Sequence, residues 1–240
     1  MIDLHTHVLP GIDDGADSLQ EAVEMCRRAA DDGIEALCAT PHQHHNLWWN
    51  GDHEDLRRRR EELQAAVGPR PRILAGAEIR VGHDFLDSLF GPEPHRPTPL
   101  AGSRWMLVEF SRQAPQPEPE GILHELRVAG WKVVLAHPEL LPWLAHDQSR
   151  LDGMADLGAK FQLTAMSLTG GFGRNPRRAA EQILDRGQAC FLASDCHGAY
   201  RRPPGLSEAR DLIAEAWGED LARRLTVDNP QAVIDDEDLP

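Results

Sequence analysis

The chain has 240 residues, of which 41% are hydrophobic and 27% are charged, so it can build one large core and is not expected to be disordered. Its formal net charge of -14 argues against nucleic acid as a partner, because a phosphate backbone would be repelled. No apolar run approaches the ~18 residues of a membrane span, and Met1-Ile2-Asp3 does not start a signal peptide. We therefore expect a cytoplasmic protein without membrane insertion, with one domain over residues 1–240.

The first half of the chain alternates helical and extended segments. Ser18-Leu19-Gln20-Glu21 is a capping box that predicts a helix ending at Gly33, followed by a short apolar run over residues 34–39. A charged helix is predicted over residues 52–67, and a strand over residues 72–75.

The second half continues the alternation. Two helix starts are predicted from an Asn cap followed by Pro, at Asn175-Pro176 and Asn229-Pro230. Pro-rich stretches at residues 91–99 and 114–119 are expected to be surface loops. Further strands are predicted over residues 105–108, 132–136, 160–165 and 189–193. About seven strands with intervening helices favour an α/β fold with a parallel sheet closed into a barrel.

Nine histidines and acidic residues fall at or just beyond the ends of the predicted strands. Two of the pairs, His5 with His7 and Asp195 with His197, are two residues apart, which puts both side chains on one face of an extended segment. Because barrels build their sites at the carboxyl ends of the strands, all nine should converge on one rim. The nine are His5, His7, Asp14, His42, Glu78, Glu109, His137, Asp195 and His197.

Imidazole nitrogens together with carboxylates suit divalent manganese, iron or zinc. Nine ligands are enough for three ions that share a bridging carboxylate, and three such ions would outweigh four carboxylates and attract a phosphate dianion. Adjacent ions would also activate a hydroxide and stabilise an in-line displacement. The constellation therefore predicts a hydrolase of phosphomonoesters.

These residues resemble the PHP superfamily, and within it the bacterial manganese-dependent protein-tyrosine phosphatases of the CpsB/YwqE type. The resemblance runs nearly end to end and is clearest in Leu9-Pro10-Gly11-Ile12-Asp13-Asp14-Gly15. It implies a distorted (β/α)7 TIM-like barrel, three metal ions and a phosphotyrosine protein as substrate, namely an autophosphorylating tyrosine kinase of capsule or exopolysaccharide regulation. The other matching segments are residues 2–7, 39–42, 78–80, 108–110, 137–139, 162, 167–173 and 194–197.

The same resemblance implies a role for each ligand. One ion would be held by His5, His7, Glu78 and Asp195, a second by Asp14, His42 and His197, and a third by Glu78, Glu109 and His137. Asp195 and His197 would thus take part in catalysis.

Substrate contacts are less completely matched. Arg202 corresponds to a family arginine that would grip the phosphate, and Arg80 follows the ligand Glu78. A second family arginine is replaced by Leu140. Trp48 and Trp49 are candidates either for an aromatic wall beside the substrate ring or for packing at the barrel rim.

Three other functions stay open on the sequence. Leu140 keeps a small phosphomonoester such as histidinol phosphate as an alternative substrate. Cys196 and Arg202 fit the C-x5-R pattern of cysteine-dependent phosphatases, although Pro203-Pro204 opposes the helix such a loop needs. The chain could also be a non-catalytic metal-binding module. Homo-oligomer formation is left open, and the four cysteines read as reduced thiols.

Overall fold

The computed structural model describes residues 1–82, 85, 89, 96–145 and 147–240. Its strands form two parallel sheets, ordered β1-β2-β4 and β3-β5-β6-β7-β8-β9. The strands are β1 (Ile2–Thr6), β2 (Ala36–Ala39), β3 (His42–Gln43), β4 (Arg72–Ala75), β5 (Glu78–Arg80), β6 (Trp105–Glu109), β7 (Lys132–Ala136), β8 (Lys160–Thr164) and β9 (Ala189–Ala193).

The two sheets are parts of one barrel. β2 continues as β3 after residues 40–41, and β4 continues as β5 after residues 76–77, so the described strands occupy seven positions around the barrel. The first and last strands close it, because Thr6 bridges Cys196 and the His7 amide donates to the Cys196 carbonyl at 3.0 Å. The predicted parallel, closed seven-stranded barrel is therefore confirmed.

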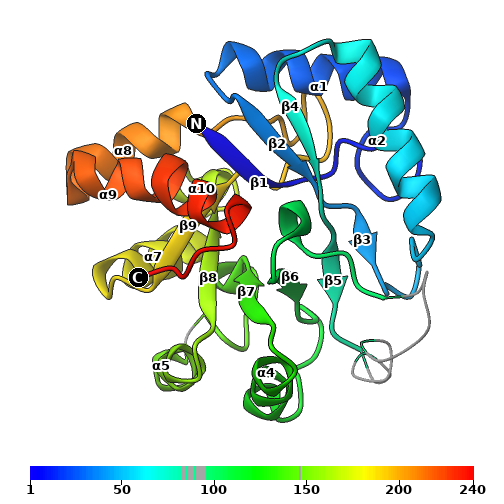
Figure 1. Cartoon of the computed structure of the whole chain (residues 1–240). Coiled ribbons are helices and arrows are strands. Elements are labelled where there is room, and N and C mark those ends of the chain that lie inside the picture. Colours follow the sequence, from blue (N-terminus) through cyan, green and yellow to red (C-terminus); the bar gives the residue numbers. More distant parts are fainter. Residues whose placement is uncertain (83–84, 86–88, 90–95, 146) are drawn as a thin grey trace.

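Helices surround the strands, as Figure 1 shows. Among the described residues no helix is long and apolar enough to cross a membrane. The helices are α1 (Leu19–Asp31), α2 (His53–Val67), α4 (Pro119–Val128), α5 (Gln148–Asp156), α6 (Ala165–Leu168), α7 (Arg174–Asp185), α8 (Ser207–Trp217), α9 (Glu219–Arg223) and α10 (Asn229–Ile234), with short turns η1 (Leu100–Gly102), η2 (Pro138–Leu140) and η3 (Arg224–Asp228).

The helix caps of the first half follow the sequence, with one difference. Ser18 caps α1 by accepting the Glu21 amide at 3.2 Å. The Glu21 carboxylate does not return to Ser18, as a full capping box would require, but accepts the amides of Asp17 and Ala199. Glu21 thus ties the start of α1 to the loop after β9.

Both predicted Asn caps are wrong. α7 begins at Arg174 with Gly173 at the cap, because Gly173 has a φ of 90° and turns the chain before Asn175 is reached. Asn229 is already helical, since η3 runs directly into α10, and its side chain donates instead to the Cys190 carbonyl at 2.6 Å.

The remaining boundaries are close to those predicted. β8 ends one residue early, at Thr164, because Ala165 opens α6. The loop expected over residues 114–119 ends where Pro119 starts α4. Of the loop expected over residues 91–99, only residues 96–99 lie among the described residues.

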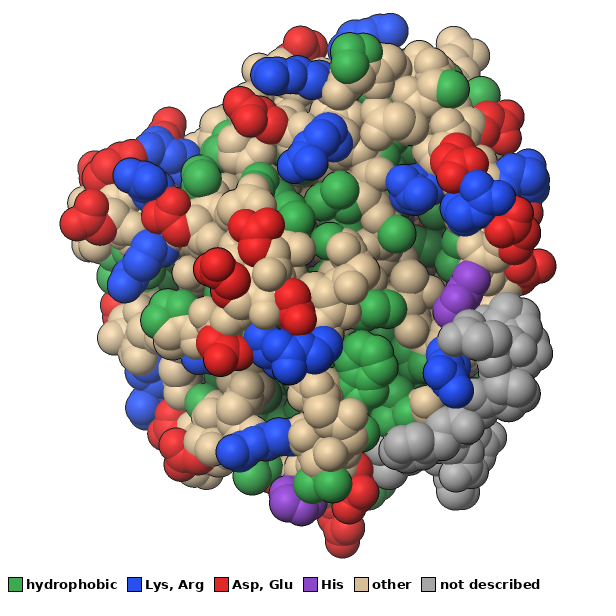
Figure 2. All heavy atoms as spheres, viewed as in Figure 1, with side chains coloured by type: hydrophobic (Ala, Val, Ile, Leu, Met, Phe, Trp, Pro, Cys, Tyr) green, Lys and Arg blue, Asp and Glu red, His purple; other side chains and the backbone are tan. Residues whose placement is uncertain are grey.

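Two hydrophobic clusters stabilise the barrel. The larger contains residues of both the strands and the surrounding helices, including Leu135 of β7 and Met25 of α1. The smaller, with Leu4, Leu107 and Phe191, takes in residues of η1 and α10 and Leu239 but none of the outer helices from α1 to α9. It therefore lies on the inner side of the strands, and α10 lies beside β1 (Figure 1), whereas the C-terminal segment reaches the start of β7, where Lys132 donates to the Asp236 and Glu237 carbonyls. On the face drawn in Figure 2, acidic and basic side chains are interspersed.

Phe191 tests the inner cluster. Because its ring is fully buried on the closing strand β9, Phe191→Ala should lower the free energy of unfolding by about 3–5 kcal/mol, measured by urea denaturation. Val128→Ala, at a site 69% exposed on α4, is the control and should change stability by less than about 0.5 kcal/mol. Equal effects of the two substitutions would contradict this packing.

Candidate metal centre

The structure brings all nine predicted ligands together. They form four overlapping groups in which the ligand atoms lie within 4.8 Å of one another. Every group shares a residue with another, so the nine form one continuous cluster. The groups are His7, Asp14, His42 and His197; His5, His137 and Asp195; His5, His7 and Glu78; and His42, Glu78 and Glu109.

The backbone after two strands turns sharply at a ligand. His137 directly follows β7 with a φ of 35°, and Asp195 follows β9 with a φ of 51°. Non-glycine residues rarely adopt this left-handed conformation, which is often kept where function requires it. Both ligands therefore lie in turns that interrupt the strand's alternation, which sequence periodicity does not reveal.

Four ligands drawn from two of these groups, His5, His7, Glu78 and Asp195, have the spacing of a metal coordination shell. His5 Nε2 lies 3.3 Å from His7 Nε2, and each lies 3.4–3.6 Å from Glu78 Oε2 and Asp195 Oδ1. Ligand atoms about 2.0–2.2 Å from a tetrahedral ion are separated by about 3.3–3.6 Å. These four side chains thus fit one ion.

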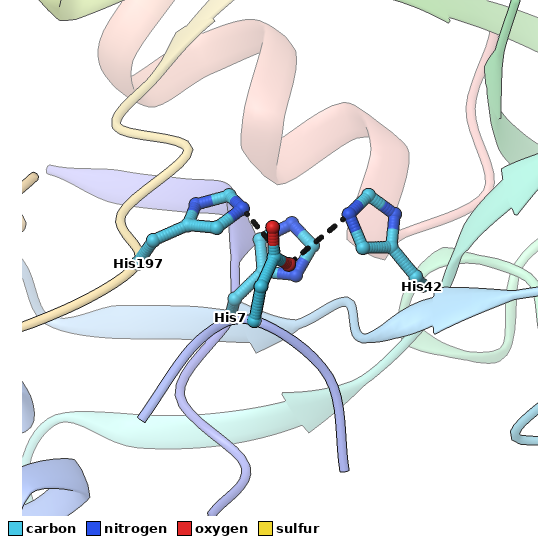
Figure 3. Close-up of side chains that lie close together, drawn as sticks. His7, His42 and His197 are labelled. Atoms are coloured by element: carbon cyan, nitrogen blue, oxygen red, sulfur yellow. Dashed lines mark ion pairs between the residues drawn. The ribbon is translucent and has the colours of Figure 1, made fainter. Parts of the chain in front are cut away.

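A second group is organised by Asp14. One of its oxygens lies 3.3 Å from His42 Nε2 and 3.4 Å from His197 Nε2. Figure 3 shows His7, His42 and His197 turned toward one another from separate segments, with dashed lines for the two ion pairs. The spacing again suits a single divalent ion.

Glu78 connects the remaining ligands to these two sets. Its two oxygens lie 2.8 Å from His137 Nε2 and 2.9 Å from His42 Nδ1. By distance, Glu109 groups with Glu78 and His42, whereas His137 groups with His5 and Asp195. This arrangement differs from the ligand division that the family resemblance implies, in which Glu109 and His137 share an ion.

Hydrogen bonds orient the imidazoles. His5 Nδ1 donates to Gln162 Oε1 at 3.0 Å, and His197 Nδ1 donates to the Asp195 carbonyl at 2.9 Å. In each ring, Nε2 is then left as the metal-binding nitrogen.

Asp13 orients two ligands, and this role was missed in the sequence. Its Oδ2 accepts from His7 Nδ1 at 2.8 Å and from the His42 amide at 3.1 Å, so one carboxylate joins the ends of two strands. Its other oxygen accepts the Gly15 amide at 2.9 Å. The only sequence signal was its place beside Asp14, which does not say which of the two acids binds metal.

The centre carries more negative than positive fixed charge. Its five carboxylates are Asp13, Asp14, Glu78, Glu109 and Asp195, and the guanidinium groups that pair with them among the described residues are Arg80 and Arg202.

The pKa values of the histidines respond to this field. Burial lowers the pKa of His42, but the carboxylates of Glu78 and Asp14 outweigh it and raise the pKa to about 11. Burial also lowers the pKa of His7, but Asp13 and Glu78 more than offset burial and raise that pKa to about 9. The centre thus recruits positive charge, and divalent cations fit this demand as well as protons do.

The two candidate arginines lie at the edge of the cluster. Arg202 donates through Nη2 to Asp195, at 2.5 Å to Oδ2 and 2.9 Å to the carbonyl oxygen, and its plane faces Phe172 at 5.4 Å. Its Nε has no hydrogen-bond partner among the described residues. Arg80 Nη1 lies 2.7 Å from Glu109 Oε2.

The two tryptophans occupy different positions. The Trp48 ring stacks on His42 at 5.2 Å and an interplanar angle of 10°, whereas Trp49 is 55% exposed and contacts His44 edge-on. Only Trp48 therefore adjoins a candidate ligand. Leu140 is buried, so it packs in the interior at the position where the family resemblance implies an arginine.

Cys196 does not have the properties of a nucleophile. Its side chain is fully buried in the larger hydrophobic cluster, and burial raises the pKa of its thiol far above the ordinary value. After Pro203-Pro204, helix α8 begins only at Ser207, so no helix directly follows the C-x5-R segment.

Comparison with known proteins agrees with the fold. Residues 1–235 match the family described as capsular polysaccharide synthesis, CpsB/CapC. The chain is 30% identical to the putative tyrosine-protein phosphatase CapC of Staphylococcus aureus, over 92% of this chain and 87% of the relative. It is 29% identical to the tyrosine-protein phosphatase YwqE of Bacillus subtilis, over 94% and 89% of the two chains.

Solved structures give the same result. One of them belongs to the crystal structures of YwqE from Bacillus subtilis and CpsB from Streptococcus pneumoniae, which are described as metal-dependent tyrosine phosphatases. It superposes with a TM-score of 0.91 at 28% identity, covering 99% of this chain and 95% of that one. A lactonase of Listeria monocytogenes, at 13% identity and a TM-score of 0.56 over 97% and 94% of the chains, shares the fold alone. The chain belongs to the CpsB/CapC family.

Proposed function

We propose that the protein is a metal-dependent phosphomonoester hydrolase, and specifically a protein-tyrosine phosphatase. The observation that carries this proposal is the continuous cluster of five histidines and four acidic residues at the carboxyl ends of the barrel strands. The spacing of His5, His7, Glu78 and Asp195 fits a tetrahedral ion, and the shared position of Glu78 suits a carboxylate that bridges neighbouring ions. We infer three divalent ions, with manganese the first candidate and iron or zinc the others.

Bound divalent ions would supply the positive charge that draws a phosphate dianion into this acidic protein and would lower the pKa of water. The protein's residues hold these ions and the substrate. Asp13 and Gln162 fix the tautomers of His7 and His5. His197 and Asp195, on the loop after β9, complete two of the groups, which is the catalytic role we assign to them.

Arg202 is the proposed phosphate-binding residue. Asp195 accepts from its Nη2 and its Cζ lies over the Phe172 ring, while its buried Nε has no partner among the described residues and keeps a donor for a phosphate oxygen. Arg80 is held by Glu109 in the same way and is the second candidate. The Trp48 ring, stacked on His42, offers an aromatic wall for the phenyl ring of phosphotyrosine, and Trp49 is a weaker candidate at the exposed rim.

The relatives named as tyrosine-protein phosphatases, in a family described by capsular polysaccharide synthesis, support a phosphotyrosine protein as substrate. We propose an autophosphorylating tyrosine kinase of capsule or exopolysaccharide production as that protein. The buried Leu140 removes one cation that would bind phosphate, which favours keeping a small phosphomonoester as the second candidate.

Metal removal separates this mechanism from cysteine catalysis. A chelator should abolish hydrolysis of a phosphotyrosine peptide and added Mn²⁺ should restore it, because every proposed catalytic group is a metal ligand or binds phosphate. Cys196→Ala should retain most activity, since the buried thiol does not reach the cluster. Turnover that resists chelation and disappears in Cys196→Ala would overturn the proposal.

Asp13 should set metal affinity. Asp13→Asn keeps the shape but removes the charge that supports His7, so Mn²⁺ affinity measured by equilibrium dialysis should fall roughly 10–100-fold. Asp17→Asn is the matched control, because Asp17 is exposed in the same loop and only its backbone amide makes a hydrogen bond. Unchanged dialysis curves for Asp13→Asn would remove Asp13 from the centre.

Arg202 should act on the substrate and not on the metals. Arg202→Ala should lose a charged hydrogen bond worth about 1.5–3 kcal/mol, seen as a roughly 10–150-fold lower kcat/KM with Mn²⁺ content unchanged.

A panel of phosphotyrosine peptides, histidinol phosphate and glycerol phosphate should show the highest kcat/KM for the peptides. A higher kcat/KM for histidinol phosphate than for the peptides would show that the substrate is a small phosphomonoester and not a phosphotyrosine protein.

A further inference from the structure

A cavity of about 260 Å³ lies outside the barrel wall, beside α2. Its apolar lining includes Leu9, Ala39, Leu56 and Ala75, and its polar lining consists of Arg57, Arg60, His53 and Thr98. The volume is near the lower end of the roughly 300–1,000 Å³ of small-molecule sites. None of the nine candidate metal ligands lines the cavity, so it is separate from the centre described above.

The two arginines of the cavity differ in how their charge is balanced. Arg57 is held by Glu54 and Glu61 through several short ion pairs along α2. Arg60 pairs with no carboxylate among the described residues. It donates to the Ile73 carbonyl at 3.2 Å, and its buried Nε has no partner in the described chain. The cavity therefore contains one guanidinium whose positive charge is not balanced by an acidic side chain.

We propose that this cavity is a second ligand site, which binds a small anion with an apolar body. The anionic group would pair with the Arg60 guanidinium, since a partly buried cation without a counter-charge gains most from a bidentate anion. The apolar body would cover Leu9 and Leu56, which line the same space. A neutral ligand of equal size would leave Arg60 unbalanced and bind more weakly.

The position of this site connects it to the metal centre. Ala39 and Ala75 face each other as the last paired residues of β2 and β4. The chain then crosses the break between the two sheets and pairs again at His42 and Glu78. A ligand in the cavity thus lies against the strand ends that lead into two candidate metal ligands, His42 and Glu78.

The probe for this site is 8-anilinonaphthalene-1-sulfonate, an apolar anion that becomes fluorescent on binding, titrated into the full-length Mn²⁺-loaded protein. Octanoate should displace it at concentrations at least tenfold lower than 1-octanol, because only octanoate supplies the negative charge. Arg60→Met keeps the apolar stem and should weaken octanoate competition at least tenfold. Ala75→Leu should fill the cavity and remove the fluorescent complex.

Arg58→Met is the matched control, because Arg58 lies on the same helix but is 60% exposed and pairs with Asp55 and Glu62. It should bind the probe and octanoate as the unchanged protein does. Equal competition by octanoate and 1-octanol, or binding that survives both Arg60→Met and Ala75→Leu, would overturn the proposal. Neither readout uses phosphatase activity, so the result is independent of the proposed function.

Discussion

The Glu78 carboxylate is the contact on which the rim of the barrel depends. It lies 2.8–3.5 Å from nitrogens of His137, His42, His7 and His5, which come from three different segments, and only 1% of its side chain is exposed. Burial raises its pKa, but the surrounding imidazoles outweigh burial and hold the pKa well below the ordinary value. Burying an ionised carboxylate costs free energy unless positive charge surrounds it. The histidines around Glu78 can supply that charge when protonated, and a bound divalent ion can supply it as well.

The break in the barrel wall explains how Glu78 reaches this position. β4 ends at Ala75 and β5 begins at Glu78, and the neighbouring β2 and β3 are interrupted at the matching place. The interruption divides the strands into two sheets and lets His42 and Glu78 resume pairing at the rim. The distortion of the barrel is thus tied to the site, because it sets where two ligands lie.

Much of the barrel and all nine candidate ligands could be predicted from the sequence, because two signals coincide: apolar runs that mark strands, and His, Asp or Glu residues at the ends of those runs. His5, His7 and Asp195 follow apolar runs, and parallel strands bring their carboxyl ends to one edge. What could not be predicted depends on tertiary contacts. Asn175 and Asn229 have ideal cap chemistry, yet Gly173 starts one helix earlier and η3 already supplies the turn before the other. The orienting role of Asp13 requires knowing that the end of β1 meets the start of β3, which neighbouring acids in a loop do not reveal.

The closure between β1 and β9 has a consequence for how the protein matures. Asp3 accepts the Ser194 amide across 191 residues of sequence, and His5 and His7 share a cluster with Asp195. During synthesis the earliest ligands leave the ribosome long before their partners on the last strand exist. A nascent chain that ends before residue 195 contains seven of the nine candidate ligands and lacks Asp195 and His197, so two of the four groups stay incomplete until the loop after β9 has been translated. The complete cluster therefore forms only after residues 195–197 have been made and β9 has paired with the start of the chain.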